Sequence, residues 1–384
     1  MMKLLFICDN FPPIVDGVGD YTSHLSNQLA QRGHAVSVIC SRKEEIVQYA
    51  GTQTAVRVLP AVTRWNRQAI APIMALAGEI QPDWVILQYV PYSYDYYGIP
   101  FWLRSLASGL KARGYKLAVT CHEIFIDLEL AKAKYWPVAI SQRLIAFSLV
   151  GLADKVVVSI ERTQRQLGRY RRKVTRIPIG SNIVPVPVTD DQVQALRREL
   201  APQGEFLFVS FGIRDQEAAL RILADLTKAG HPARLVLLGK LRPEQRQATE
   251  QLIATLGLEG RVTLTGYLDN DQLFRVLRSG DAFMLLEEKR GGLTTKSGSL
   301  AAAYAAGLPV IGTCGHMTDG FFRNGENALL APEGDYNGTL ENARNVMRDP
   351  ALRARLRQNA RDTHATQLSW EKIAGKYLEI LSES

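Results

Sequence analysis

Short apolar runs alternate with amphipathic segments along the first half of the chain. The runs are continuously apolar, which is typical of parallel strands that are buried on both faces of a sheet. Between the first two runs, Tyr21, Leu25 and Leu29 recur at helical spacing, and Gly33 stands where that helix should end. The predicted strands are 4–8, 35–40, 84–90, 116–121 and 155–160, with further helices at 99–110 and 139–152.

The second half repeats this alternation, which predicts a parallel, doubly wound sheet in each half. Its strands are predicted at 206–211, 233–238, 262–265, 282–286 and 309–312, and its helices at 217–228, 243–256, 270–279 and 299–306. Two final helices, 351–363 and 370–381, precede no strand and must pack on existing surface. Segment 183–191, IVPVPVTDD, has two prolines and no helical period, so we expect the domain linker there.

Length and composition favour an ordinary two-domain protein. The chain has 384 residues, of which 46% are hydrophobic and 22% charged. Its four cysteines are widely separated and lie in or beside predicted strands, a pattern that favours reduced core thiols. The apolar run after Lys3 is too short for a signal peptide, and no stretch approaches the ~18 apolar residues needed to cross a membrane. We therefore expect a cytoplasmic protein.

The formal net charge of +8 is unevenly distributed. The densest group of basic residues lies between 162 and 176. One interpretation of this group is a solvated helix face and loop. The other is docking onto an anionic membrane or substrate, with ~1 kcal/mol from each basic residue near such a surface. Nucleic acid is not expected as a partner, because neither a binding motif nor interleaved aromatic residues accompany the charge. The group comprises Arg162, Arg165, Arg169, Arg171, Arg172, Lys173 and Arg176.

The most informative segment for function is 291–315, GGLTTKSGSLAAAYAAGLPVIGTCG. A small-residue loop runs into an alanine-rich helix, whose start Ser297 or Ser299 can cap. Free amides and the dipole at a helix start favour an anion, and Lys296 adds a full positive charge, so the segment suits a diphosphate. The alternative is an ordinary capped helix that packs on a sheet through its alanines. The loop after the first strand has glycines but no G-x-G-x-x-G, so a nicotinamide or flavin site is not supported.

Several segments together resemble a known family. NFPPIVDGVGDYTSHLSNQLAQRGHAVSVIC looks like the opening of the GT-B-fold, retaining, nucleotide-sugar glycosyltransferases called group 1 or family 4. PDWVILQYVPY, AVTCHEI, ADKVVVSIERT, RIPIGSNI, GYLDNDQLFRVLRSGDAFML and AAGLPVIGT resemble its later landmarks in the same order, over essentially the whole chain. The resemblance implies an α/β chain of two Rossmann-like domains that face a cleft. Residues 1–185 would be the acceptor-side domain, 186–365 the donor-binding domain, and helix 366–384 would cross back to the first.

The resemblance also implies roles for residues of the first domain. His122, after a predicted strand in VTCHE, matches the histidine that reaches the transferred sugar or its diphosphate, although a histidine satisfied at a strand end is the alternative. Gly17 and Gly19 match first-loop glycines that approach the donor phosphate and acceptor, with Asp16 where the first glycine of the usual pair is expected. Asp20 is predicted to cap the following helix rather than to contact an acceptor hydroxyl.

In the second domain the match includes two departures. The family usually grips the diphosphate with an arginine and a lysine, whereas this chain has Arg214 and no lysine at that spacing, so Lys296 would replace it. The family's paired glutamates fall on Thr294 and Ala302, and Glu287 and Glu288 upstream are the candidates to compensate. The resulting donor-side residues are Gly266, Tyr267 and Leu268, whose backbone would hold the base, together with Thr294, Thr295, Ser297, Gly298, Ser299 and Glu288.

The favoured function is transfer of a hexose from a UDP-sugar, UDP-glucose above others, to a hydroxyl of a saccharide or lipid-linked acceptor. The resemblance implies retention of configuration, no metal or other cofactor, and a role in polysaccharide or cell-envelope glycan biosynthesis. The docking interpretation of the basic group adds peripheral contact at the inner face of an anionic membrane. His122, Lys296 and Arg214 would be the catalytic residues. Two alternatives stay open: a GT-B-fold UDP-sugar epimerase and a non-catalytic subunit that binds sugar nucleotides.

Overall fold

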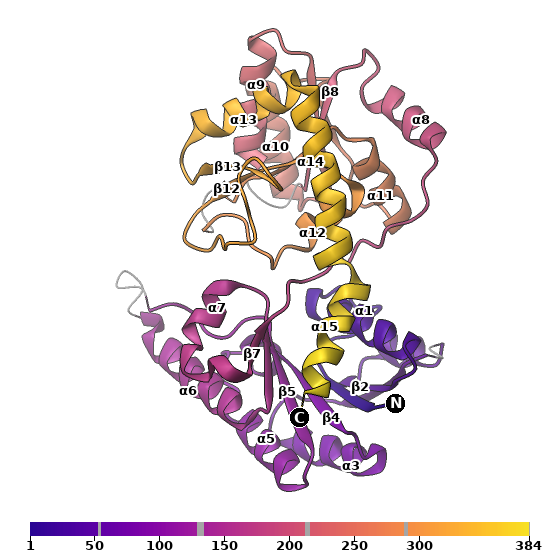
Figure 1. Cartoon of the computed structure of the whole chain (residues 1–384), viewed down its shortest axis with the longest axis vertical. Coiled ribbons are helices and arrows are strands. Elements are labelled where there is room, and N and C mark those ends of the chain that lie inside the picture. The colour runs from indigo at the N-terminus through magenta and orange to yellow at the C-terminus, as the bar shows by residue number, and fades with distance from the viewer. Residues whose placement is uncertain (53–54, 129–133, 212–215, 288–290, 384) are drawn as a thin grey trace. The chain divides into compact units, whose positions relative to one another are not determined.

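The computed structural model of the chain describes residues 1–52, 55–128, 134–211, 216–287 and 291–383 (Figure 1). It contains two compact units. Unit 1 comprises Met1–Pro178 and Trp370–Ser384, and unit 2 comprises Ile179–Ser369. Within the described ranges, no helix combines the length and the hydropathy needed to span a membrane.

Unit 1 is built on a seven-stranded sheet in the order β3-β2-β1-β4-β5-β6-β7, and all its neighbouring strands pair in parallel. The central strands β1, β4 and β5 are almost wholly buried, as their apolar sequences predict. The strands are β1 (Lys3–Ile7), β2 (Ala35–Ser41), β3 (Arg57–Val62), β4 (Trp84–Tyr89), β5 (Lys116–Cys121), β6 (Lys155–Val158) and β7 (Val174–Arg176).

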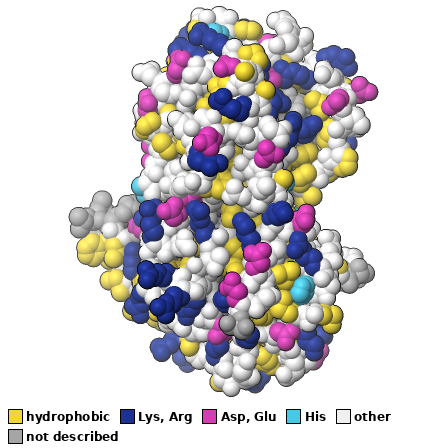
Figure 2. Space-filling model, in the orientation of Figure 1, with side chains coloured by type: hydrophobic (Ala, Val, Ile, Leu, Met, Phe, Trp, Pro, Cys, Tyr) yellow, Lys and Arg dark blue, Asp and Glu magenta, His cyan; other side chains and the backbone are white. Residues whose placement is uncertain are grey.

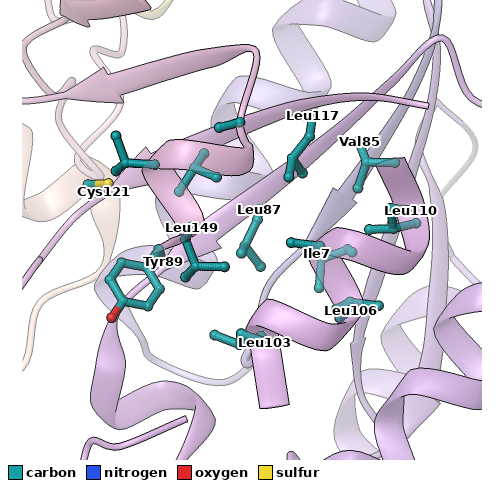
Figure 3. Packing of buried hydrophobic residues seen from close by; sticks show 14 of the residues in the cluster. Ile7, Val85, Leu87, Tyr89, Leu103, Leu106, Leu110, Leu117, Cys121 and Leu149 are labelled. Atoms are coloured by element: carbon teal, nitrogen blue, oxygen red, sulfur yellow. The ribbon is translucent and has the colours of Figure 1, made fainter. Parts of the chain in front are cut away.

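Helices cover both faces of this sheet (Figure 1). Leu87 and Leu117 of the sheet pack against Leu103 and Leu106 of α5 and Leu149 of α6 in one buried cluster (Figure 3). The helices are α1 (Gly17–Gln31), α2 (Glu44–Ala50), α3 (Ile70–Ile80), α4 (Pro91–Tyr94), α5 (Trp102–Ala112), α6 (Trp136–Leu152), α7 (Glu161–Gln166) and α15 (Trp370–Ser382), with 3-10 turns at η1 (Arg67–Ala69) and η3 (Gly168–Lys173).

Unit 2 repeats the plan with a six-stranded parallel sheet in the order β10-β9-β8-β11-β12-β13. Its strands are β8 (Phe206–Phe211), β9 (Ala233–Leu238), β10 (Val262–Leu264), β11 (Ala282–Leu285), β12 (Val310–Cys314) and β13 (Leu329–Pro332). Its helices are α8 (Asp190–Leu200), α9 (Gln216–Lys228), α10 (Pro243–Thr255), α11 (Asn270–Ser279), α12 (Gly298–Ala306), α13 (Tyr336–Arg348) and α14 (Pro350–Thr363), and a π-helical turn follows at His364–Leu368. The two parallel α/β sheets are those that the alternating sequence pattern predicts.

The first boundary between the units lies earlier than the sequence predicts. Segment 183–191 is not a free linker, because Ile183, Val186 and Val188 pack against the core of unit 2. The Val184 N–H also donates to the Asn270 side chain at 2.8 Å. The unit therefore begins at Ile179 and not at residue 186. Its end lies later than residue 365, because Leu368 is buried in the same core.

The last helix, α15, packs within unit 1. It lies along α1 (Figure 1), and Ile373, Tyr377, Ile380 and Leu381 are buried. The Trp84 indole N–H donates to the Leu381 carbonyl at 3.0 Å. This helix thus supplies core residues to the unit from the far end of the sequence.

Candidate active site

His122 follows β5 at the carboxyl edge of the unit 1 sheet. Its backbone N–H donates to the Tyr89 carbonyl at 3.0 Å, which continues the pairing of β4 with β5. Its Nε2 lies 2.7 Å from the Gln88 amide oxygen, and the Gln88 side chain is buried. The edge of the Tyr21 ring packs against the imidazole at 4.8 Å between centroids. A half-buried imidazole is thereby held in a fixed orientation at the edge where parallel sheets bind ligands.

A buried chain of hydroxyls lies beneath this histidine. The hydroxyl of Tyr377 is 2.9 Å from both the Tyr21 hydroxyl and the Thr120 hydroxyl. Burial raises the pKa of Tyr377 to about 12, so the network is neutral at physiological pH. The Trp370 ring stacks on His24 and meets the edge of Tyr21 at 5.2 Å. Helix α15 thus supports the residue that packs on His122.

The first loop is capped differently from the sequence-based expectation. The side chain of Asp16, not Asp20, caps α1: its Oδ1 accepts from the Val18 and Gly19 N–H groups at 3.1 and 2.7 Å. Asp20 lies one turn inside the helix because α1 begins at Gly17. The residue that stands where the resemblance predicts a loop glycine is thus the helix cap.

The two loop glycines differ in their surroundings. A Cβ at Gly19 would lie 2.8 Å from the Asn10 carbonyl oxygen, so this position requires glycine because the loop packs on the start of the helix. A Cβ at Gly17 would meet no atom within 4 Å. Gly17 is therefore the one whose backbone has open space in front of it.

Asp9 is a further polar residue at this edge, two residues after the end of β1. The Ser41 hydroxyl donates to one of its oxygens at 2.6 Å. Burial raises the pKa of the Asp9 carboxyl, while the bond from Ser41 opposes that shift. Sequence reasoning missed both Asp9 and Gln88 as polar groups of this edge. The available signal was a polar residue at the end of an otherwise apolar run, as in WVILQY.

In unit 2, residues 291–293 pack tightly against β12 and the residues that follow it. The Leu293 N–H donates to the Thr313 carbonyl at 2.8 Å, and the Gly291 N–H donates to a Glu333 carboxylate oxygen at 2.6 Å. Gly292 has φ +82°, and a Cβ there would lie 2.5 Å from the Gly315 nitrogen. Only glycine allows this close approach, so the glycine pair before the lysine serves to build the loop.

Helix α12 starts where this loop ends. Ser297 is its N-cap: the hydroxyl accepts from the Leu300 N–H at 3.3 Å and lies 2.9 Å from the Ser299 hydroxyl. Lys296 is exposed directly before the cap. A Cβ at Gly298 would lie 3.8 Å from the Gly180 carbonyl oxygen, so the loop of residues 180–182 borders the helix start. The first amides of the helix and two hydroxyls thus lie together, and Lys296 directly precedes them in the chain.

Two predicted donor-side residues, Thr294 and Thr295, come just before the start of α12 and are less exposed than Lys296. Thr295 is buried, and its hydroxyl donates to the Asp319 carboxylate at 3.2 Å, which anchors the loop. Thr294 is half-buried beside it. Ala302, at the position of the family's second glutamate, is fully buried in the core of the unit. This alanine thus contributes to the core packing of the unit.

The turn at 266–268 follows β10 at the same carboxyl edge. Gly266 has φ +70° and forms a bridge with Gly239. Tyr267 is 79% exposed, while Leu268 packs against the core. Arg214 and Glu288, the remaining predicted residues, lie outside the described residues. Glu287 is buried, and its N–H donates to the Thr313 hydroxyl at 3.0 Å.

Two family models match the chain. Residues 205–363 match the family described as "Glycosyl transferases group 1", and residues 15–183 match "Glycosyltransferase Family 4". The chain is 31% identical over 141 residues to the lipopolysaccharide core biosynthesis glycosyltransferase LpsE of Rhizobium meliloti, a stretch that covers 36% of this chain and 39% of that protein. It is 23% identical over 296 residues to the 2-deoxystreptamine N-acetyl-D-glucosaminyltransferase of Niallia circulans, covering 72% of each.

Among solved structures, the Anabaena protein HepE in complex with UDP superposes with a TM-score of 0.75 at 16% identity, over 100% of both chains. A glycosyltransferase of Rickettsia africae gives 0.74 at 15% identity, over 100% of this chain and 99% of that one. The stretch matched in LpsE spans well under half of that relative, whereas these structural matches span the whole fold. Taken with the two family matches, they show that the chain belongs to the group 1 glycosyltransferases and has the GT-B fold.

Proposed function

We propose that this chain is a retaining glycosyltransferase that moves a hexose from a UDP-sugar, UDP-glucose above others, to a hydroxyl of a saccharide or lipid-linked acceptor. The observation that carries the proposal is the start of α12, where the exposed Lys296 and the Ser297 cap precede the first amides of the helix. UDP-bound HepE shares this fold over its full length, and relatives such as LpsE act in lipopolysaccharide core biosynthesis by name. We therefore assign the reaction to polysaccharide or cell-envelope glycan biosynthesis in the cytoplasm.

The donor's departing group is a nucleoside diphosphate, which gains negative charge as the bond to the sugar breaks. The amides of Gly298 and Ser299, the two serine hydroxyls and Lys296 form a preorganised set of donors for that charge. These groups are fixed before substrate arrives, because Thr295 ties the loop to Asp319. In this proposal they and Arg214 carry the positive charge that the diphosphate requires, and no metal or other cofactor takes part.

The sugar is assigned to His122, and the base to the turn at Gly266, Tyr267 and Leu268. An imidazole that is oriented by Gln88 and packed on Tyr21 can donate or accept one hydrogen bond at a defined place. Such a bond lowers the barrier only if it strengthens in the transition state. We assign Gly17 to the donor phosphate and Thr294 to the sugar. Glu288 is assigned to the contact that the family's glutamates make.

A panel of nucleotide sugars tests this function. The protein is incubated with each donor, with and without a saccharide acceptor, and released UDP and the sugar products are separated by chromatography. The proposal predicts acceptor-dependent UDP release, greatest with UDP-glucose, and an α-linked product from that α-configured donor. An isomerised UDP-sugar formed without acceptor would identify an epimerase. Donor binding by calorimetry without any turnover would indicate a non-catalytic subunit.

A further inference from the structure

Helix α6 has apolar residues on two opposite faces. Ala139, Ile145 and Leu149 are buried in the core of unit 1. Trp136, Ile140 and Leu144 lie on the other side at four-residue spacing, and their exposed fractions are 36%, 49% and 60%. A surface helix of a folded domain normally presents polar residues to water. We call these three side chains the α6 stripe.

The apolar surface extends beyond the helix itself. Among the described residues, nine of the fourteen exposed large hydrophobic side chains lie between Tyr92 and Leu144. Four of them are aromatic residues of the segment 92–101. This segment lies against α6, because a Cβ at Gly98 would fall 2.6 Å from the Gln142 amide nitrogen. Exposed apolar side chains gathered in a segment and in the helix that it contacts are typical of an interaction site.

A basic cluster borders the C-terminal half of α6. The 3-10 turn η3 is bonded to the helix: the Tyr170 hydroxyl donates to the Phe147 carbonyl at 3.3 Å, and Lys173 Nζ donates to the Gly151 carbonyl at 3.0 Å. Figure 2 shows Lys and Arg side chains gathered over this part of unit 1, at the lower left, beside hydrophobic ones. The η3 cluster consists of Arg165, Arg169, Arg171, Arg172 and Lys173, of which the four arginines are exposed.

We propose that the α6 stripe and the η3 cluster form one docking surface for an anionic lipid bilayer. The apolar side chains enter the interfacial region, and the basic ones pair with lipid phosphates. Trp and Tyr, which lie among the exposed residues, favour this boundary. The exposed arginines of the η3 cluster decide the occupant, because lipid phosphates complement their charge. The surface involves neither His122 nor Lys296, so the inference does not depend on the reaction.

Vesicle sedimentation tests the surface with the full chain. We expect the protein to sediment with vesicles of phosphatidylcholine and phosphatidylglycerol and not with phosphatidylcholine alone, and high salt should release it. Arg171→Glu with Arg172→Glu should weaken binding at least about tenfold, since each basic residue contributes about fivefold. The matched control is Arg64→Glu with Arg67→Glu, the same charge change beside β3 at the opposite edge of the sheet. Both double variants lower the net charge of the protein equally. The control should therefore bind anionic vesicles within about twofold of wild type, because its changed charges lie away from the docking surface.

A second pair of substitutions tests the apolar contribution. Ile140→Ser with Leu144→Ser changes exposed side chains, so the fold should survive, and binding to anionic vesicles should fall about tenfold or more. Wild type that stays in the supernatant with anionic vesicles would overturn the proposal. Equal loss in the η3 and β3 double variants would also overturn it, because net charge alone would then explain binding. A wild-type dimer that the Ile140/Leu144 variant converts to monomer would assign the surface to self-association instead.

Discussion

The two units hold their candidate site residues by different means. In unit 1, His122 is positioned by the side chains of Gln88 and Tyr21, and Tyr21 is itself supported by Tyr377 of α15. In unit 2, one continuous stretch, 291–299, supplies the loop, the lysine and the helix start. A site made of backbone groups is local in sequence, whereas a site made of side chains draws on residues hundreds of positions apart. The two should therefore respond differently to mutation.

The largest effect should follow removal of Trp370–Ser384. The four large buried side chains of α15, Ile373, Tyr377, Ile380 and Leu381, contribute ~1.5–3 kcal/mol each. Together they approach the whole stability of a domain, ~5–15 kcal/mol. We expect hydrogen exchange of β4 and β5 to lose protection, while unit 2 keeps its own. The control removes only Glu383 and Ser384, which costs an exposed ion pair with Lys155. Unchanged protection of β4 and β5 after the longer deletion would show that α15 does not hold unit 1 together.

His122→Ala should have the next largest effect. If the imidazole acts on the sugar, turnover of UDP-glucose should fall about 100-fold, in the range typical of a lost acid–base or hydrogen-bonding group. UDP affinity should change less than about twofold. His231→Ala, in unit 2 ahead of β9, is the matched control and should behave as wild type. Parallel losses in turnover and in UDP affinity would assign His122 a structural role.

Gln88 is a positioning residue, so a smaller effect is expected. Gln88→Leu removes the oxygen at 2.7 Å from His122 Nε2 and should lower kcat about tenfold with little change in KM. Gln88→Glu retains an acceptor oxygen and should recover part of that loss. If both variants are equally slow and equally destabilised, burial of Gln88 rather than its bond to His122 is what matters.

The smallest predicted effect is a loss of folding stability at alkaline pH, and this loss should arise mainly in unit 1. Burial raises the pKa of Tyr377, Cys40 and Cys121 to about 12 each. The folded state therefore keeps protons that the unfolded state releases from about pH 8.5 upward, so stability falls as pH rises toward 12. Tyr377→Phe should cost ~1–2 kcal/mol at pH 7 through its lost hydroxyl bonds. It should also flatten the decline in urea midpoint between pH 9 and 11, and an unchanged slope would contradict this assignment.

Much of the fold follows from the sequence because buried strands are continuously apolar. The strands that sequence reasoning missed are β3, β7 and β13, and each lies at the edge of a sheet. Edge strands are short or carry proline, as β3 does at Pro60 and β13 at Pro332, because one side of them needs no partner. Their patterns therefore lack the length and the apolar continuity that identify central strands.

Some features of the candidate sites could be predicted from the sequence and others could not. The Lys296 loop and the Ser297 cap could be predicted, because capping depends on residues within three positions of each other. The cap of α1 was misplaced at Asp20 because the helix begins one turn earlier than the apolar spacing suggests. The bond from Gln88 to His122 could not be predicted, since it depends on the register of β4 against β5. That register is a property of the sheet.

The most direct test of the account is the affinity of the full-length protein for UDP, measured by calorimetry on three variants. Lys296→Ala should weaken the Kd about fivefold to tenfold, because it removes a charge-assisted contact at an exposed position. His122→Ala should leave the Kd within about twofold, and so should Lys228→Ala, which removes an exposed lysine at the far end of α9. An unchanged Kd in Lys296→Ala would contradict the assignment of the diphosphate to the start of α12.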